Sequence, residues 1–198
     1  MRYCAISPDG TSIAFTYKGD IYTVPVNGGK AAQITTNAAH DTHPVWSPDG
    51  KQIAFASDRM GSMDIFVVDR EGGIPKRLTT HSGNETPVAF KDADHILFLA
   101  NVMPSAEDAQ FPSGQFQQVY EVSTTGDRPV MFSSMPMEDI SINKTGNALL
   151  YHDKKGYEDP WRKHHTSSIT RDIWLCSLDG KRSYRKLTSF CLLYTSDA

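Results

Sequence analysis

A two-part phrase occurs four times along this 198-residue chain and limits the possible folds more than any other feature. Its first part, AISPDGTSIAF, begins at Ala5 and returns as VWSPDGKQIAF at Val45. Looser copies follow as VAFKDADHILF at Val88 and ISINKTGNALLY at Ile140. Repetition with a period of about 40 to 45 residues is the sequence signature of stacked structural repeats. The repeat unit is therefore the natural unit of the fold.

A second phrase follows each copy and completes the unit. Its four versions are, in chain order, DIYTVPVNGGKAAQIT from Asp20, DIFVVDREGGIPKRLT from Asp64, QVYEVSTTGDRPVMFS from Gln118 and DIWLCSLDGKRSYRKLT from Asp172. Short apolar runs bounded by Gly, Pro, Asn and Asp are typical of strands. Each unit therefore predicts four short strands, which in the second unit lie at about residues 42–46, 52–57, 64–69 and 75–80.

A Ser-Pro-Asp-Gly segment separates the first two expected strands in the first and second units. Proline presets φ for the first central position of a turn, and glycine supplies a residue that adopts positive φ. We interpret these segments as structural turns, so that their two carboxylates are turn residues and not catalytic groups. The residues are Ser7, Pro8, Asp9, Gly10, Ser47, Pro48, Asp49 and Gly50.

The expected strands are apolar on both faces. Ile53 and Phe55 point one way, while Ala54 and Ala56 point the other. A half-solvated sheet would alternate between apolar and polar residues, whereas stacked blades bury both faces of each sheet. We therefore predict an all-β fold: a β-propeller of four four-stranded blades that form an incomplete, open propeller. The predicted blades span residues 1–35, 36–80, 81–133 and 134–190.

Two long insertions interrupt the third and fourth units between their second and third strands, at residues 101–117 and 152–171. Alternate connections of an up-and-down blade share a face, so both insertions are expected to leave the same face. We hypothesise that residues 110–117 and 161–168 form one composite binding surface, because aromatic and arginine side chains are typical anchors. The candidate binding residues are Phe116, Trp161, Arg162, His164, His165 and Arg171.

No catalytic or cofactor motif occurs in the sequence: GxSxG, HExxH, the P-loop and the dinucleotide fingerprint are all absent. Adjacent histidines on an extended chain point to opposite sides, which disfavours chelation of one metal ion by His164 and His165. A triad of Ser167, His165 and Asp159 can be drawn, but nothing in their spacing demands it. We expect no catalytic residue, no metal and no cofactor in this chain.

The charge distribution indicates which classes of binding partner are favoured. The net charge of −3 does not favour nucleic acid. Residues 154–186 carry nine Lys or Arg against four Asp or Glu, a balance that favours an acidic peptide, a C-terminal carboxylate or another domain. No run approaches the roughly 20 apolar residues that a membrane span requires, and no signal peptide is visible at the N-terminus. We expect a peptide or protein ligand, no nucleic acid and no membrane span.

The phrase WSPDGKQIAFASDR, with DIFVVD, GG and RLT after it, resembles the propeller repeat of tricorn-type serine peptidases. The Tol-system periplasmic propeller and prolyl-oligopeptidase-type enzymes share this repeat. Three further segments are similar to the N-terminal propeller of tricorn-like peptidases from Bacteroidetes-type bacteria, and the likeness extends over residues 2–190. They are RYCAISPDGTSIAFTYKGDIYTVPVNGG, THSGNETPVAFKD and KGYEDPWRKHHTSSITRDIW.

The resemblance implies a non-catalytic propeller that gates or holds peptides for a serine protease core. It also implies an intact parent that is a periplasmic or secreted serine endopeptidase, with further blades, a PDZ-like module and the catalytic core after this region. The family's catalytic residues have no matching positions here, so none is carried over. Two alternatives remain: a Tol-type binding propeller with no enzyme attached, and the propeller of a prolyl-oligopeptidase-type peptidase.

The last residues, 191–198, read CLLYTSDA and match nothing upstream. They can be encoded by a DNA sequence that resembles a transposase adapter used to prepare sequencing libraries. We therefore expect this segment not to be native and the natural gene to continue into a fifth blade; the alternative is a native, divergent C-terminal cap.

Overall fold

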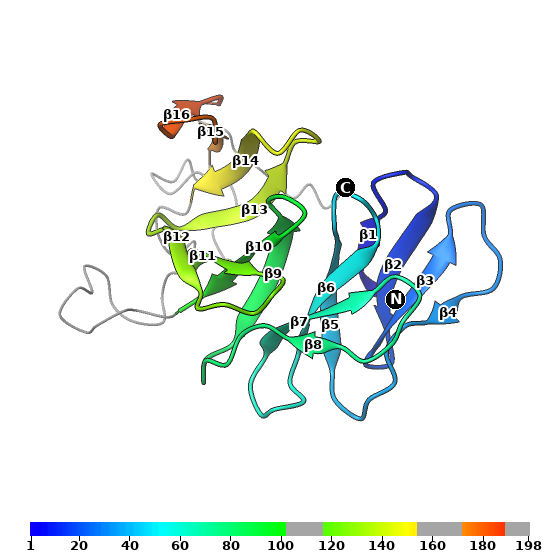
Figure 1. Cartoon of the computed structure of the whole chain (residues 1–198). Coiled ribbons are helices and arrows are strands. Elements are labelled where there is room, and N and C mark those ends of the chain that lie inside the picture. Colours follow the sequence, from blue (N-terminus) through cyan, green and yellow to red (C-terminus); the bar gives the residue numbers. More distant parts are fainter. Residues whose placement is uncertain (102–116, 154–171, 189–198) are drawn as a thin grey trace, which may run out of the picture. The chain divides into compact units, whose positions relative to one another are not determined.

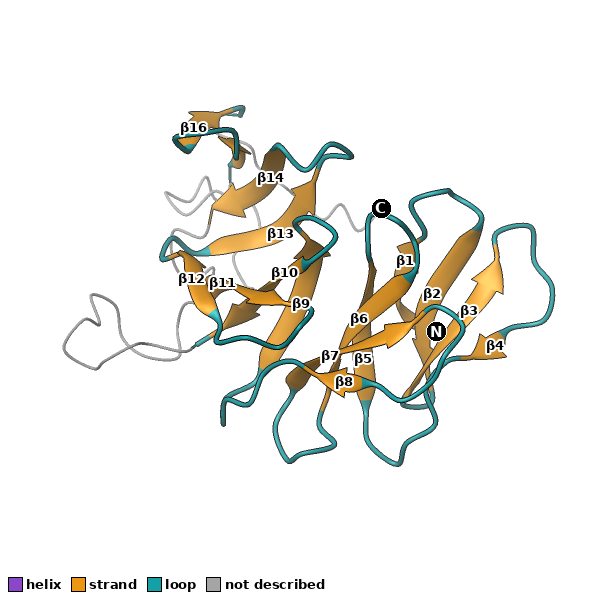
Figure 2. Cartoon of the chain, viewed as in Figure 1, coloured by secondary structure: helices purple, strands orange, loops and turns teal. Residues whose placement is uncertain are grey.

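The structure, a computed structural model, describes residues 1–101, 117–153 and 172–188, and every regular element in these ranges is a β-strand (Figures 1 and 2). Within them the strands form four antiparallel sheets, each made of four consecutive strands. No helix in this described part has the length and apolar character needed to cross a membrane.

The strands follow the order of the repeat. The first sheet contains β1 (Arg2–Ile6), β2 (Ser12–Tyr17), β3 (Asp20–Pro25) and β4 (Ala32–Gln33). The second contains β5 (Asp41–Trp46), β6 (Gln52–Ser57), β7 (Asp64–Asp69) and β8 (Lys76–Arg77). The third contains β9 (Glu85–Phe90), β10 (His95–Ala100), β11 (Gln118–Ser123) and β12 (Val130–Ser133). The fourth contains β13 (Met137–Ile142), β14 (Ala148–Asp153), β15 (Ile173–Ser177) and β16 (Ser183–Lys186).

The sheets belong to two compact units, residues 1–135 with the first three sheets and residues 136–198 with the fourth. Each described strand pairs only within its own sheet, so no strand pairing links the four sheets into a closed ring. The predicted all-β class, with four four-stranded blades of an incomplete propeller, is confirmed.

The outermost strand of the second sheet is shorter than the sequence pattern predicts. Only Lys76–Arg77 forms a strand, where residues 75–80 are expected to form one. Beyond it the backbone amide of Leu78 still donates to the Ile65 carbonyl at 2.8 Å. At the next position the hydroxyl of Thr79 takes over and accepts the amide of Ile65 at 2.9 Å. A side chain therefore replaces the last rung of the backbone ladder.

This hydrogen bond accounts for two positions of the recurring second phrase, the isoleucine after the aspartate and the closing threonine. In three of the sheets the amide of the isoleucine that follows the aspartate donates to the hydroxyl of the closing threonine at 2.9 Å; the pairs are Ile21–Thr35, Ile65–Thr79 and Ile173–Thr188. In two of these sheets a basic residue of the outer strand also reaches the aspartate. Arg77 lies 2.8 Å from Asp64, and Lys186 lies 2.6 Å from Asp172.

The second sheet is buried on both faces within the first unit, beside the third sheet in Figure 1. One face packs on the first sheet, in a cluster of Ala14, Ile21, Ile34, Trp46, Ile53, Phe55, Phe66 and Val68. The other face packs on the third sheet, in a cluster of Ala54, Ile65, Val67, Leu78, Phe90, Ile96, Phe98, Ala100, Tyr120 and Val122. Each large apolar side chain buried in this way stabilises the fold by about 1.5–3 kcal/mol.

The Ser-Pro-Asp-Gly segments form hydrogen-bonded turns. The Ser47 hydroxyl accepts the amide of Gln52 at 2.9 Å and donates to the Asp49 carboxylate at 2.7 Å. In the first sheet the same bond from Ser7, followed by bonds from Thr11, lowers the pKa of Asp9 to about 2. Both carboxylates are thus engaged within their own turns.

Candidate functional site

The six candidate binding residues of the two long insertions lie outside the described residues. They are Phe116, Trp161, Arg162, His164, His165 and Arg171. The composite surface expected from residues 110–117 and 161–168 falls there too, apart from the exposed Gln117. The site built below comes from a different part of the first unit.

A cavity of about 560 Å³ lies in the first unit, at the junction of the second and third sheets. Strands β9 to β12 and the segment before β12 supply most of the lining residues, and the segment between β8 and β9 supplies the rest. The residues that give it chemical character are His81, Glu85, Phe98, Tyr120, Arg128 and Met131. A space of this size accommodates a small molecule or a few side chains of a peptide.

Glu85 is the buried carboxylate of this cavity. It is the first residue of β9 and only 1% exposed. The hydroxyl of Thr79 donates to its Oε2 atom, and its own amide donates to the carbonyl of Met63 at 2.8 Å. Burial raises the pKa of Glu85 from its ordinary value of 4.5 to about 7; the Thr79 bond opposes this change, and the nearby Asp64 adds to it. The buried position of Glu85 therefore destabilises the ionised form of its carboxylate.

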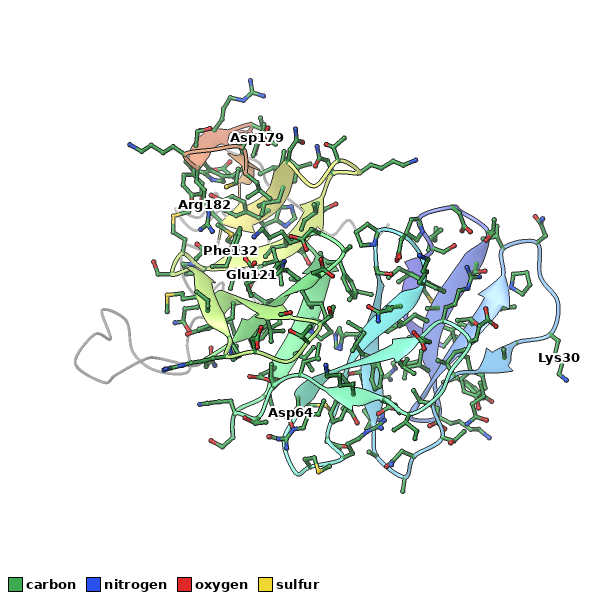
Figure 3. The ribbon with its side chains drawn as sticks, in the orientation of Figure 1. Lys30, Asp64, Glu121, Phe132, Asp179 and Arg182 are labelled. Carbon is green, nitrogen blue, oxygen red and sulfur yellow. The ribbon has the colours of Figure 1, made fainter. Side chains whose placement is uncertain are left out.

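A second buried carboxylate lies beside Glu85. Asp64, labelled in Figure 3, begins β7 and is fully buried. Arg77 from β8 lies 2.8 Å from its Oδ2 atom. Burial raises the pKa of Asp64, and the charge of Arg77 opposes that change. Of the two buried carboxylates, Asp64 is the one that Arg77 contacts.

An aromatic pair completes the site. Phe98 in β10 and Tyr120 in β11 are cross-strand partners whose ring centroids lie 5.7 Å apart at an interplanar angle of 28°. Tyr120 is 5% exposed, and its buried hydroxyl has no hydrogen-bond partner among the residues that the structure describes. Burial raises the pKa of this hydroxyl. We call Glu85, Phe98 and Tyr120 the third-sheet cluster.

A matching group, the second-sheet cluster, consists of Asp41, Phe55 and Phe66. Asp41 begins β5 and is fully buried, and the two phenylalanine rings stack at 5.9 Å. The guanidinium of Arg59 occupies this cluster. Its Nη2 atom lies 2.9 and 2.8 Å from the two oxygens of Asp41, and its centre lies 5.5 Å from the Phe55 ring and 4.8 Å from the Phe66 ring.

Reasoning from the sequence missed the residues of both clusters. The motifs sought were catalytic ones, and Glu85 stands alone in a turn-rich stretch. The available signal was the repeat itself. When the second and third units are aligned strand by strand, Asp41 corresponds to Glu85, and the pair Phe55 and Phe66 corresponds to Phe98 and Tyr120.

A family model described as the tricorn protease N-terminal β-propeller domain matches residues 1–192 of this chain. The chain therefore belongs to the family of tricorn N-terminal β-propeller domains. The resemblance identified from its repeat phrases is confirmed.

Relatives with curated names agree with this assignment. Tricorn protease homolog 1 of Streptomyces coelicolor is 37% identical over 87 residues, which are 44% of this chain and 8% of that protein. The tricorn protease homolog of Saccharolobus solfataricus is 25% identical over 202 residues, which cover 96% of this chain and 17% of that protein. The chain thus spans only a small part of the length of these relatives.

Solved structures show the same fold. A putative TolB from Agrobacterium tumefaciens superposes with a TM-score of 0.67 at 23% identity, over 93% of this chain and 65% of that one. The tricorn protease superposes with a TM-score of 0.60 at 12% identity, over 93% of this chain and 22% of the protease chain. At these identities the likeness establishes the β-propeller fold.

Proposed function

We propose that this chain is the non-catalytic propeller portion of a tricorn-like serine peptidase and that it binds or gates peptide substrates for a protease core. The observation that carries the proposal is the family match, which extends over residues 1–192. The intact parent is then a periplasmic or secreted serine endopeptidase, and this region contributes recognition and no chemistry.

The cavity of the first unit gives the proposal a physical basis. Its walls combine apolar side chains with a few buried polar groups, which is the usual make-up of a binding pocket. The two long insertions are the second element of the proposal. Loops on a rigid scaffold commonly carry recognition residues. Their proposed anchors are Phe116, Trp161, Arg162, His164, His165 and Arg171.

A Tol-type interaction propeller is the second candidate, and the TM-score of 0.67 with a putative TolB favours it. Such a protein would bind a folded partner instead of extended peptides. The two functions therefore differ in the ligand that the chain retains.

Retention of peptides on the immobilised full chain tests the proposal. A digest of denatured casein by a protease that cuts after glutamate is passed over the chain, and mass spectrometry identifies what stays bound. We expect selective retention of a subset of peptides with no further cleavage. Failure to retain any peptide at concentrations of a few hundred micromolar would rule out the peptide-binding role, and cleavage would rule out the non-catalytic one.

A further inference from the structure

We infer that the third-sheet cluster of Glu85, Phe98 and Tyr120 is a binding site for a guanidinium group and takes an arginine side chain of a peptide ligand. The inference rests on the proposed peptide-binding function and adds the identity of the recognised group. Four observations support it. The strand register makes the two clusters equivalent, and the second-sheet cluster already holds an arginine. The Glu85 carboxylate has no arginine of its own among the described residues, and the third-sheet cluster lines a cavity.

The strand register makes the two clusters equivalent. In the second sheet Phe55 pairs with Phe66, and Asp41 pairs with Ser57, two residues after Phe55. In the third sheet Phe98 pairs with Tyr120, and Glu85 pairs with Ala100, again two residues after Phe98. Each cluster thus places a carboxylate and two stacked rings at the same positions of a blade. In the fourth sheet the place of the carboxylate is taken by Met137.

The second-sheet cluster demonstrates what such an arrangement binds. It holds the guanidinium of Arg59, whose side chain is only 11% exposed, against both the carboxylate of Asp41 and the two rings. Guanidinium groups combine strong hydrogen bonds to carboxylates with favourable stacking on aromatic faces, and an ammonium group matches this combination less well. An arginine is therefore the expected occupant of the equivalent cluster.

The third-sheet cluster has no arginine of this kind among the described residues. The Oε2 atom of Glu85 accepts a hydrogen bond from the neutral Thr79, while Arg77 is engaged with Asp64. The strand register identifies the residues that differ: Arg59 stands two positions after Ser57, whereas valine stands two positions after Ala100. Within the described ranges the carboxylate has no cation of its own, and burial raises its pKa.

The cavity and Tyr120 supply the independent observation. Phe98, Tyr120 and Glu85 all line a cavity of about 560 Å³, so the cluster faces space that a ligand can enter. The Tyr120 hydroxyl is buried there and lacks a partner in the described part of the chain. A buried polar group without a partner is costly, and a ligand that accepts its hydrogen bond would relieve that cost. A peptide carbonyl beside the arginine side chain can do so.

The other charged groups around the site decide how strongly a cation is attracted. They are Asp64 from β7, Arg77 from β8, His81 from the following connection and Arg128 from the segment before β12. Asp64 and Arg77 neutralise each other. His81 and Arg128 are exposed on the wall of the cavity, so they screen the site but do not fill the buried position. Arg128 is the internal competitor that the experiment must address.

The test is a titration of the full chain with the capped tripeptide acetyl-Gly-Arg-Gly-amide and with the same peptide containing citrulline. Citrulline keeps the shape of arginine and loses its charge. We expect the arginine peptide to bind about tenfold more tightly, because hydrogen bonds between charged groups contribute more than those of a neutral urea group. Its affinity should also increase as the pH rises through about 7, because Glu85 must be ionised to bind it.

Two variants and one control make the result specific. Glu85→Gln should abolish the preference for arginine, and Tyr120→Phe should weaken binding of both peptides a few-fold. Glu71→Gln, at a side chain that is 87% exposed, should leave the preference intact. Circular dichroism establishes that each variant is folded.

Equal affinity for the arginine and citrulline peptides, or a preference that survives in Glu85→Gln, would overturn the inference. Binding that appears only in Arg128→Gln would also overturn it, because an arginine of the chain itself would then be the occupant. Retention of casein peptides tests the proposed function separately. If Glu85→Gln retains the same peptides as the unmodified chain, the arginine site is wrong while the peptide-binding function stands.

Discussion

The second and third sheets each place a carboxylate and two stacked aromatic rings at equivalent positions, but the two carboxylates have different partners. In the second sheet Arg59 binds both oxygens of the buried Asp41 carboxylate, and its guanidinium lies over the Phe55 and Phe66 rings. In the third sheet Glu85 faces a cavity, with a neutral hydroxyl as its partner. The comparison suggests how a binding site can arise within a repeat. The third unit retains the carboxylate and the two rings but has valine at the position of Arg59.

The energetic difference between the clusters follows from their partners. A buried carboxylate is tolerated when a cation and hydrogen bonds replace the water that it loses. Asp41 has both oxygens bound by Arg59. Glu85 has no such cation among the residues that the structure describes, and burial raises its pKa to about 7. Perturbed groups of this kind in a cavity are typical of functional sites.

Removal of Arg59 should have the largest effect on stability. Arg59→Met keeps the length of the side chain but leaves the fully buried Asp41 unpaired. We expect the free energy of unfolding to fall by about 3–5 kcal/mol, measured by urea denaturation at pH 7. The control is Arg128→Met at the third-sheet cavity, which should change it by less than about 0.5 kcal/mol. Similar effects from both substitutions would contradict the contrast between the two clusters.

Neutralising Glu85 should raise the free energy of unfolding, whereas removal of Arg59 should lower it. Its folded pKa of about 7 lies above its ordinary 4.5, so the folded state binds the proton more tightly than the unfolded state. The stability that this provides is complete below pH 4.5 and is lost as the pH rises through about 7. Glu85→Gln should therefore stabilise the chain at pH 8 by up to about 3 kcal/mol relative to its effect at pH 4.

Thermal or urea unfolding of the Glu85→Gln variant and the unmodified chain over pH 4–8 measures this difference. The matched control is Glu71→Gln at an exposed position, which should show no such trend. A difference between variant and unmodified chain that stays constant with pH would mean that Glu85 is not an unneutralised buried acid.

Substitutions of the aromatic residues should change the free energy of unfolding by a smaller amount. Phe66→Tyr introduces a hydroxyl into a packed site under Arg59 and should lower the free energy of unfolding by about 1–2 kcal/mol. Tyr120→Phe removes a hydroxyl that has no partner in the described residues, and we expect no loss or a gain of up to about 1 kcal/mol. If the two substitutions destabilise equally, the third-sheet hydroxyl has a structural partner and the site is not open.

The turns at the other end of the sheets should give the smallest effects. Ser47→Ala removes the hydroxyl that accepts the Gln52 amide, and the expected loss of stability is about 1 kcal/mol. The third sheet has Lys91 at the corresponding turn, where its amino group lies 2.9 Å from Glu121. Lys91→Met should cost about 0.5 kcal/mol, because partly exposed ion pairs contribute little. Chemical denaturation at low and high salt distinguishes them, since only the Lys91 effect should weaken with salt.

Much of the fold could be predicted from the sequence because its determinants are local. A turn such as Ser47 to Gly50 depends on adjacent residues, and the run around Ile53 and Phe55 depends on a period of two. Three of the four strands expected in the second unit agree with the observed strands to within one residue. The outer strand differs because the side chain of Thr79 replaces a backbone bond, which the strand pattern does not reveal.

The candidate site depends on residues far apart in the chain. Glu85, Phe98 and Tyr120 come from three strands, and Thr79 and Asp64 come from the neighbouring sheet. The pKa of Glu85 and the partnerless state of the Tyr120 hydroxyl are consequences of burial, which is a property of the packed sheets. The repeat, most strand positions, the turns and the family can be read from the amino-acid sequence. The pairing of Asp41 with Arg59 and the position of Glu85 on a cavity become visible only in the folded chain, because burial and charge compensation arise when distant segments pack together.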